Sequence, residues 1–182
     1  MAVSFRRAEP TDFAAILDIH LAAFPHDPSV AEMVQDLLND PSALPALSVI
    51  ACNADGTPIG HILFTAAHIE GTPYKINVQI LAPLAIIPEM QSQGIGTQLI
   101  SYGLQLLKQQ ECELVFVLGH PDYYPRCGFA PAARQGFHAP YPIPEEVADA
   151  WMMLPLKPEA IIGVSGTVRC AKAMDKPEHW RE

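Results

Sequence analysis

The feature that most constrains this fold is a long apolar run that ends near a pair of glycines and is followed by an amphipathic helix. The run VQILAPLAII covers residues 78–87, and nearly continuous apolar stretches of this kind are typical of strands buried on both faces. After Gly94 and Gly96, apolar residues recur at helical spacing, which predicts a helix over 97–110. A second buried strand, CELVFVLGH at 112–120, follows directly. These segments predict a central βαβ unit.

Strands and helices alternate along the rest of the chain as well. Helices are predicted over 10–24, with Thr11 as N-cap, and over 28–40, with Ser29 as N-cap. Residues 46–69 are predicted to form a hairpin around the turn pair Asp55-Gly56. Further strands are predicted at 3–8, 74–87, 151–156 and 163–171. Because no repeat or linker divides the chain, we expect one mixed α/β domain over residues 1–182.

Composition and charge exclude several classes of function. The chain has 182 residues, 49% of them apolar, and a formal net charge of −9 with no cluster of Lys and Arg, which argues against a nucleic-acid partner. No apolar run is long enough to cross a bilayer, and the N-terminus does not have the pattern of a signal peptide. The four cysteines are far apart, and no His, Asp or Glu cluster has metal-ligand spacing. We therefore expect a soluble cytoplasmic protein without a metal.

The glycines at the strand–helix turn raise the possibility of a phosphate site. A helix N-terminus carries unpaired N–H groups and partial positive charge, and glycine lets a ligand approach the backbone closely. Two familiar phosphate motifs do not fit, because Gly96 is followed by Thr97-Gln98 rather than Lys-Ser/Thr, and Leu99 stands where a dinucleotide fingerprint needs its third glycine. The alternative is a helix entered through glycine with nothing bound there.

A different pattern does fit. The sequence QSQGIG, residues 91–96, has the form Q-x-x-G-x-G and follows an apolar strand and Pro88. It resembles the coenzyme A loop of the GNAT superfamily of N-acetyltransferases, and of their bacterial members in particular. A second segment, YYPRCGF at 123–129, is similar to the family motif in which a tyrosine lies four residues before the glycine of a Gly-Phe pair; Tyr124 holds that position. The likeness extends over most of the chain.

The resemblance implies a GNAT-like fold, a central twisted mixed sheet flanked by helices, with acetyl-CoA as co-substrate. It also implies roles for main-chain groups. The N–H of Leu84, at a strand bulge, would face the acetyl carbonyl oxygen, Ala85 and Ile86 would border the pantetheine arm, and His120 would line the other side of the cleft. The backbone amides of the loop would hold the pyrophosphate; these belong to Gln91, Ser92, Gln93, Gly94, Ile95, Gly96 and Thr97.

The expected chemistry is acetyl transfer to an amine. In the resemblance, Leu84 N–H stabilises the oxyanion and Tyr124 donates a proton or hydrogen bond to the leaving thiolate. Tyr124 could instead be a core aromatic that packs beside Phe129, and the hydroxyl of its neighbour Tyr123 has no role in the family pattern. An amine with a pKa near about 10.4 is neutral in only about one molecule in a thousand at pH 7, so a base is also expected.

The residue that acts as this base is left open by the sequence. Some family members carry a glutamate four residues before the oxyanion donor, but here that position is Ile80. His68, Glu70 and His120 are candidates acting through a water molecule, and each of them could equally be an ordinary loop or surface group. Three further histidines have no partner pattern in the sequence and are predicted to be structural; these are His20, His61 and His138.

The predicted function is therefore an N-acetyltransferase that moves acetyl from acetyl-CoA to a small-molecule or peptide amine by direct attack in a ternary complex. Two alternatives stay open. The missing strand glutamate would suit a non-catalytic module that binds or senses acyl-CoA, and the transferase could also use a longer acyl group or a hydroxyl acceptor. The acceptor, and whether the chain is a monomer or a homodimer, do not follow from the sequence.

Overall fold

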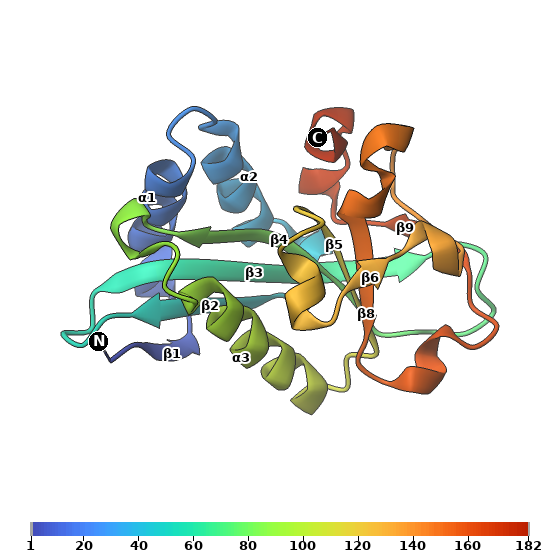
Figure 1. The fold of residues 1–182 in the computed structure, drawn as a ribbon, viewed down its shortest axis with the longest axis horizontal. Coiled ribbons are helices and arrows are strands. Elements are labelled where there is room, and N and C mark those ends of the chain that lie inside the picture. The colour runs from blue at the N-terminus through green and yellow to red at the C-terminus, as the bar shows by residue number, and fades with distance from the viewer. Residues whose placement is uncertain (1, 182) are drawn as a thin grey trace.

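The computed structural model describes residues 2–181, and its main feature is one mixed sheet with helices on both faces (Figure 1). The α-helices are α1 (Phe13–Ala23), α2 (Ser29–Leu38) and α3 (Ile95–Gln109). The strands are β1 (Ser4–Arg7), β2 (Leu47–Cys52), β3 (Pro58–Ile69), β4 (Val78–Ile86), β5 (Leu114–Leu118), β6 (Ala130–Pro131), β7 (Phe137–His138), β8 (Trp151–Pro155) and β9 (Gly166–Arg169). Short 3-10 helices join them at Pro10–Asp12, Pro41–Ala43, Pro88–Met90, Tyr124–Cys127, Ala133–Gln135, Glu145–Ala150, Pro158–Ile161, Lys172–Met174 and Pro177–Trp180.

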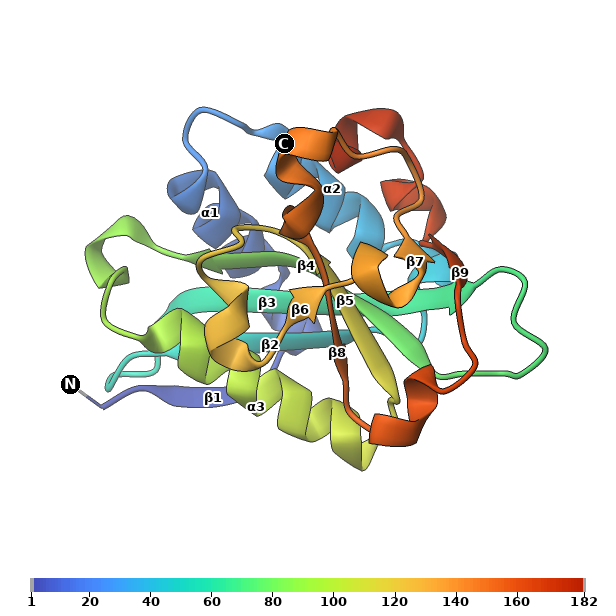
Figure 2. The same cartoon turned by 45° about the vertical axis from the view of Figure 1, so that its right-hand side comes forward.

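The strand order is β1-β2-β3-β4-β5-β8-β6, and β9 pairs with the far end of β3 and with β7. Neighbours along the main path are antiparallel except β4 and β5, which are parallel and joined by α3. This confirms the βαβ unit, because a parallel pair needs a crossover connection. Strands β5 and β8 run steeply across the direction of β3 and β4 (Figure 2).

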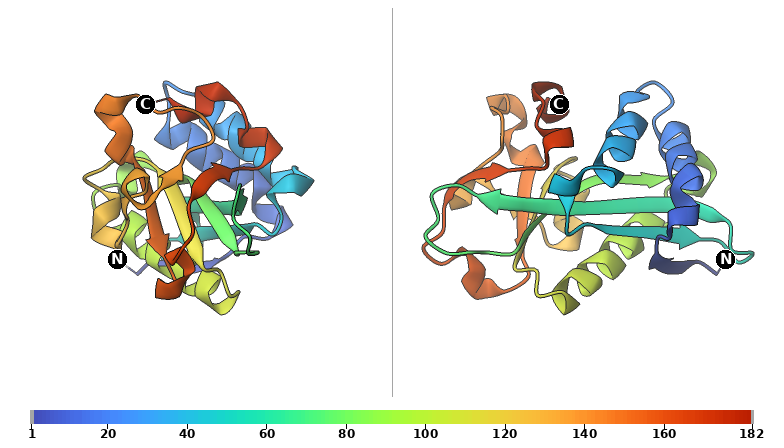
Figure 3. Two further views of the ribbon diagram at one scale, coloured as in Figure 1. Left: turned by 90° about the vertical axis from the view of Figure 1, so that its right-hand side faces the viewer. Right: turned by 180° about the vertical axis from the view of Figure 1, so that it is seen from behind.

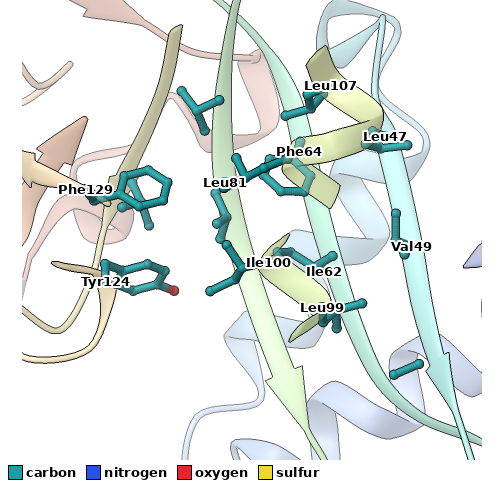
Figure 4. Packing of buried hydrophobic residues seen from close by; sticks show 14 of the residues in the cluster. Leu47, Val49, Ile62, Phe64, Leu81, Leu99, Ile100, Leu107, Tyr124 and Phe129 are labelled. Atoms are coloured by element: carbon teal, nitrogen blue, oxygen red, sulfur yellow. The ribbon is translucent and has the colours of Figure 1, made fainter. Parts of the chain in front are cut away.

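The helices divide the core into two layers. Helix α3 covers one face of the sheet, and α1, α2 and the C-terminal turns cover the other (Figure 3). On the α3 face, Leu99 and Leu107 pack with Phe64 and Leu81, as the helical spacing predicts (Figure 4). Gly103 lies directly against the Phe64 ring, where a side chain would not fit. The opposite layer includes the Trp151 and Trp180 rings, packed edge to face with their centroids 5.6 Å apart.

Helix boundaries differ from the sequence prediction in three places. Thr11 is not an N-cap: Pro10 starts a 3-10 turn, and Glu9 N–H donates to the Asp12 carboxylate over 2.7 Å. Asp12 also receives two hydrogen bonds from Arg6. Ser29 is the first residue of α2 rather than its cap, and its hydroxyl donates to the Asp27 carboxylate instead of a backbone group of the helix. Helix α3 begins at Ile95, two residues earlier than predicted.

Candidate active site

The glycine loop enters α3 through two residues with left-handed backbone. Ser92 has φ 60° and Gly94 has φ 78°, a conformation that glycine adopts without steric cost. No side chain caps the helix at Gly94, so the N–H groups of its first turn receive no side-chain acceptor. The Gln91 side chain donates to the Ile86 carbonyl over 2.9 Å and ties the loop to the end of β4. The loop thus presents a helix N-terminus whose first N–H groups are free of a side-chain cap.

Gly96 has a different reason for lacking a side chain. It lies inside the first turn of α3, and a Cβ there would collide with the hydroxyl oxygen of Tyr123 and touch Leu84 Cδ2 at 3.6 Å. Burial raises the pKa of Tyr123, and the Thr97 side chain offsets part of this rise. Tyr123 therefore packs on the loop itself, a position that the sequence pattern did not indicate.

Strand β4 is bulged opposite Leu63, as expected from the resemblance. The register moves from Leu81↔Phe64 to Leu84↔Ile62, so that two residues, Ala82 and Pro83, face one residue of β3. Pro83 has no N–H to contribute to a ladder, and prolines within sheets are found at such irregular positions.

Beyond the bulge, alternate backbone N–H groups of β4 point toward the side of the strand that no longer pairs with β5. Ile87 N–H donates to the Ile59 carbonyl, so by the alternation of antiparallel pairs Ala85 bonds β3 while the N–H groups of Leu84 and Ile86 point away from it. On that side, pairing of β4 with β5 ends at Leu81↔Val117. The two parallel strands therefore separate where Leu84 N–H and Ile86 N–H face outward.

Two cavities meet at this opening. One, of about 530 Å³, lies over the glycine loop and is lined by Ile86, by loop residues from Gln91 to Thr97 and by Arg126. The other, of about 500 Å³, lies on the side of α1 and α2 and is lined by residues that include Tyr124 and His120. We call them the loop cavity and the helix-side cavity. Leu84 and Tyr123 line both of them.

Most of the predicted site residues are brought together here, but not all. Leu84, Ile86, Gln91, Ser92, Gly94, Ile95, Gly96 and Thr97 line the loop cavity, and Leu84, His120 and Tyr124 line the helix-side cavity. Ala85 is buried and lines neither of them. Gln93 lies on the exposed side of the loop, where its side chain donates to the Glu89 carbonyl.

Tyr124 begins the 3-10 helix after β5 and is 9% exposed. Its ring lies edge-on to Phe129 (Figure 4), with ring centroids 5.8 Å apart. It also lies edge-on to the Tyr123 ring, with centroids 5.2 Å apart. The ring also lies against Gly119, where a Cβ would collide with it. Gly128, with φ 95°, closes the same turn. Tyr124 thus packs beside Phe129 and also forms part of the helix-side cavity wall. The two predicted roles, a core aromatic and a donor to the leaving thiolate, are therefore compatible.

The candidate bases are separated by the fold. His68 lies near the C-terminal end of β3, where it pairs with Arg169 of β9. Glu70 comes directly after β3, and its carboxylate accepts a hydrogen bond from the Arg169 guanidinium over 2.9 Å. At about 3.3 Å per residue, His68 is roughly 20 Å from Ile62, which pairs with Leu84, so neither residue is placed to act on a group beside Leu84. His120 does line the helix-side cavity.

His179 also lines the helix-side cavity, although the sequence analysis did not single it out. Burial lowers its pKa from the ordinary value, so its imidazole is neutral at neutral pH. It lies in the C-terminal turns together with Met174 and Trp180, whose indole N–H donates to the Met174 carbonyl over 2.9 Å. The Asp40 carboxylate holds this segment in place by accepting the Ala173 N–H. No periodic pattern in the sequence marks these residues as part of a site.

His20 and His61 form a buried pair between α1 and β3. His20 Nε2 and His61 Nδ1 are 2.7 Å apart, and His61 Nε2 is 2.9 Å from the Ser48 hydroxyl. Burial lowers the pKa of His20 to about 4 and lowers that of His61 well below its ordinary value. Both rings are therefore neutral at pH 7 and bridge the helix to the sheet. His138 lies exposed on β7, away from both cavities.

Residues 2–181 also bear on metal binding and on membrane insertion. In this part of the chain no group of three or more His, Cys, Asp or Glu side chains is arranged to hold a metal ion. The same residues include no helix that has the length and apolar character needed to cross a membrane.

The arrangement of bulged strand, glycine loop and separated parallel strands defines a known class of protein. The Acetyltransferase (GNAT) family matches residues 13–137, and the chain belongs to this family. The chain is 44% identical over 169 residues to the uncharacterized N-acetyltransferase YjhQ of Escherichia coli, with 92% of each chain covered. It is 30% identical over 138 residues to the uncharacterized N-acetyltransferase YhbS of E. coli, with 76% of this chain and 78% of the relative covered. The predicted family and mixed α/β fold are confirmed.

Solved structures support the same assignment. E. coli YhbS in complex with CoA superposes with a TM-score of 0.86 at 26% identity, covering 96% of this chain and 92% of that one. A GNAT acetyltransferase from Brucella melitensis in complex with acetyl-CoA gives a TM-score of 0.74 at 26% identity, with 96% and 99% covered. The ligands of both structures agree with the predicted co-substrate.

Proposed function

We propose that the chain, acting as one domain, transfers acetyl from acetyl-CoA to a primary amine by direct attack in a ternary complex. The observation that carries the proposal is the meeting of two cavities at Leu84 and Tyr123. One cavity would hold the coenzyme and the other the acceptor. The thioester would then lie between them, where an amine can reach the carbonyl carbon without a covalent enzyme intermediate.

The loop cavity suits the coenzyme arm. Uncapped N–H groups at the start of α3, with the backbone amides of residues 91–97, would receive the pyrophosphate. The outward N–H of Ile86 would hydrogen-bond the pantetheine arm as an added strand does. Arg126, which the sequence analysis did not single out, lines the same cavity and would add a cation for the phosphates.

The proposed reaction breaks the thioester C–S bond and forms a C–N bond. The amine nitrogen attacks the carbonyl carbon, and the outward N–H of Leu84 would stabilise the oxyanion. As the intermediate collapses, Tyr124 would give its hydroxyl proton or a hydrogen bond to the departing sulfur. The amine loses one proton and the thiolate gains one, so the products are an amide and free CoA.

The amine must be neutral when it attacks. Burial in the helix-side cavity disfavours an ammonium ion and lowers the pKa of a bound amine. His120 and His179 line the cavity, and either imidazole would accept the released proton, directly or through water. This combination would replace the glutamate that is absent at Ile80.

The test is thiol release from acetyl-CoA with a panel of amines, followed by two matched variants. Tyr124→Phe keeps the ring, and we expect turnover to fall by about 10² while acetyl-CoA affinity changes little. Tyr102→Phe removes a hydroxyl on α3 from a residue that lines neither cavity, and it should leave turnover unchanged. Full activity in Tyr124→Phe would remove Tyr124 from the mechanism. Tight acetyl-CoA binding without acetylation of any amine, peptide or extract component would favour the sensing module.

A further inference from the structure

The walls of the helix-side cavity are apolar on the side away from the glycine loop. Phe24 follows α1, and Val30 and Met33 lie on one side of α2. Met174 and Trp180 of the C-terminal turns complete the apolar wall. These side chains come from segments that are far apart in the sequence and converge on one space.

Charge is nearly absent from this lining. No Asp or Glu is found among the described residues that line the cavity, and its charged side chain is the cation Arg181, which is exposed. Three carboxylates act electrostatically on His179, but all of them are exposed to solvent and none lines the cavity; these are Glu178, Asp27 and Asp36. An acceptor with a second ammonium group would bury that charge against apolar side chains without a partner, which is costly.

We propose that the acceptor is a primary amine with an apolar alkyl or aryl body and no second positive charge. This inference rests on the proposed acetyl transfer and names the class of its acceptor. Apolar burial would bind the body of the acceptor, and the same surroundings would favour the neutral, nucleophilic form of its amine. Polyamines and lysine-rich peptides would bind poorly despite the acidic net charge of the chain, because that charge lies outside the cavity.

The experiment compares two amines of the same shape, hexylamine and 1,5-diaminopentane, in which a terminal methyl group replaces a terminal ammonium. Thiol release from acetyl-CoA gives kcat/KM for each amine with the wild-type chain. We expect hexylamine to exceed 1,5-diaminopentane by at least tenfold, because the second ammonium has no carboxylate to meet.

Variants on α2 test whether the cavity wall causes this preference. Met33→Glu places a carboxylate in the wall. It should lower the ratio of kcat/KM for hexylamine to kcat/KM for 1,5-diaminopentane at least tenfold, so that the two amines react equally or the diamine reacts faster. Met33→Gln controls for the loss of the thioether and should keep the preference for hexylamine. Gln35→Glu adds the same charge change on the exposed side of the same helix and should leave both rates unchanged. Circular dichroism and thermal melts confirm that each variant is folded.

The outcomes separate this inference from the proposed function. Equal rates, or faster acetylation of 1,5-diaminopentane by wild type, would overturn the apolar acceptor while leaving acetyl transfer intact. An unchanged preference in folded Met33→Glu would also overturn it; if that variant does not fold, Val30→Glu takes its place. If neither amine is acetylated, calorimetry with hexylamine in the presence of CoA decides, and absence of binding overturns the inference. Failure to bind acetyl-CoA would instead refute the proposed function.

Discussion

Replacing Gly96 with alanine isolates the contact between the loop and Tyr123. At this helical position alanine has the better intrinsic propensity, by about 0.5–1 kcal/mol, but its methyl group would meet the Tyr123 hydroxyl. Moving the half-buried ring out of its packed position to make room for the methyl group would cost about 1 kcal/mol. The two contributions nearly cancel, so we expect thermal stability close to wild type.

Binding should respond differently from stability in Gly96→Ala. The displaced ring borders both cavities, and we expect acetyl-CoA affinity, measured by calorimetry, to weaken about tenfold, or about 1.4 kcal/mol. Adding Tyr123→Phe removes the colliding oxygen. The next atoms, Tyr123 Cζ at 3.5 Å and Leu84 Cδ2 at 3.6 Å, are at ordinary contact distance from the new methyl group. The double variant should therefore bind as Tyr123→Phe does alone.

Two results would refute this reasoning. Wild-type affinity in Gly96→Ala would mean that the hydroxyl moves aside without consequence for the loop. A double variant as weak as Gly96→Ala would mean that the methyl group obstructs the coenzyme itself, so that Gly96 serves close approach of phosphate rather than packing of Tyr123. A charged substitution such as Gly96→Asp cannot distinguish the two explanations, because it opposes both the phosphates and the ring.

Three further changes test other parts of the structure. Gly94→Ala forces alanine to φ 78° with only Gln98 Nε2 nearby, at 3.9 Å, so urea unfolding should show a loss of about 1–2 kcal/mol. Burial lowers the pKa of His20 to about 4, so the unfolded chain binds protons first as pH falls below 6.5. His20 alone should contribute about 2 kcal/mol to the loss of stability from pH 7 to pH 5, and the total loss should be smaller in His20→Gln. A profile equally steep in that variant would assign the loss to other groups. Arg126→Gln should weaken CoA about tenfold but leave S-acetylpantetheine binding, which involves no pyrophosphate, unchanged in calorimetry.

The central unit of the fold could be predicted because each of its signals is local. The apolar run of β4, the glycine turn and the spacing of Leu99 and Leu107 each depend on neighbours in the sequence. Their order then implies a parallel pair and a crossover helix. The two additional residues at the start of α3 could not be predicted, because Ile95 and Gly96 resemble loop residues until the φ of Gly94 is known.

The acceptor side could not be predicted in the same way. The helix-side cavity is lined by residues that are far apart in the sequence, such as Met33 and Trp180. The C-terminal 3-10 turns that carry Trp180 are too short to show a periodic pattern of apolar residues. Proximity in sequence was also misleading for His68, because the twelve-residue strand β3 carries it far from Leu84. For Tyr123, the motif places two tyrosines side by side, and only the turn from His120 onward determines which ring packs on the loop.

The paired indoles give the molecule a built-in optical reporter. The chain has two tryptophans, Trp151 and Trp180, and they touch each other beneath the helix-side cavity, whose wall includes Trp180. Intrinsic tryptophan emission therefore arises next to the space where an acceptor would sit, and neither indole lines the loop cavity. An amine that enters this cavity should change the emission without any label or coupled assay. Replacing Trp151 with phenylalanine would leave Trp180 as the single emitter, so that ligands could be sorted by which of the two cavities they occupy.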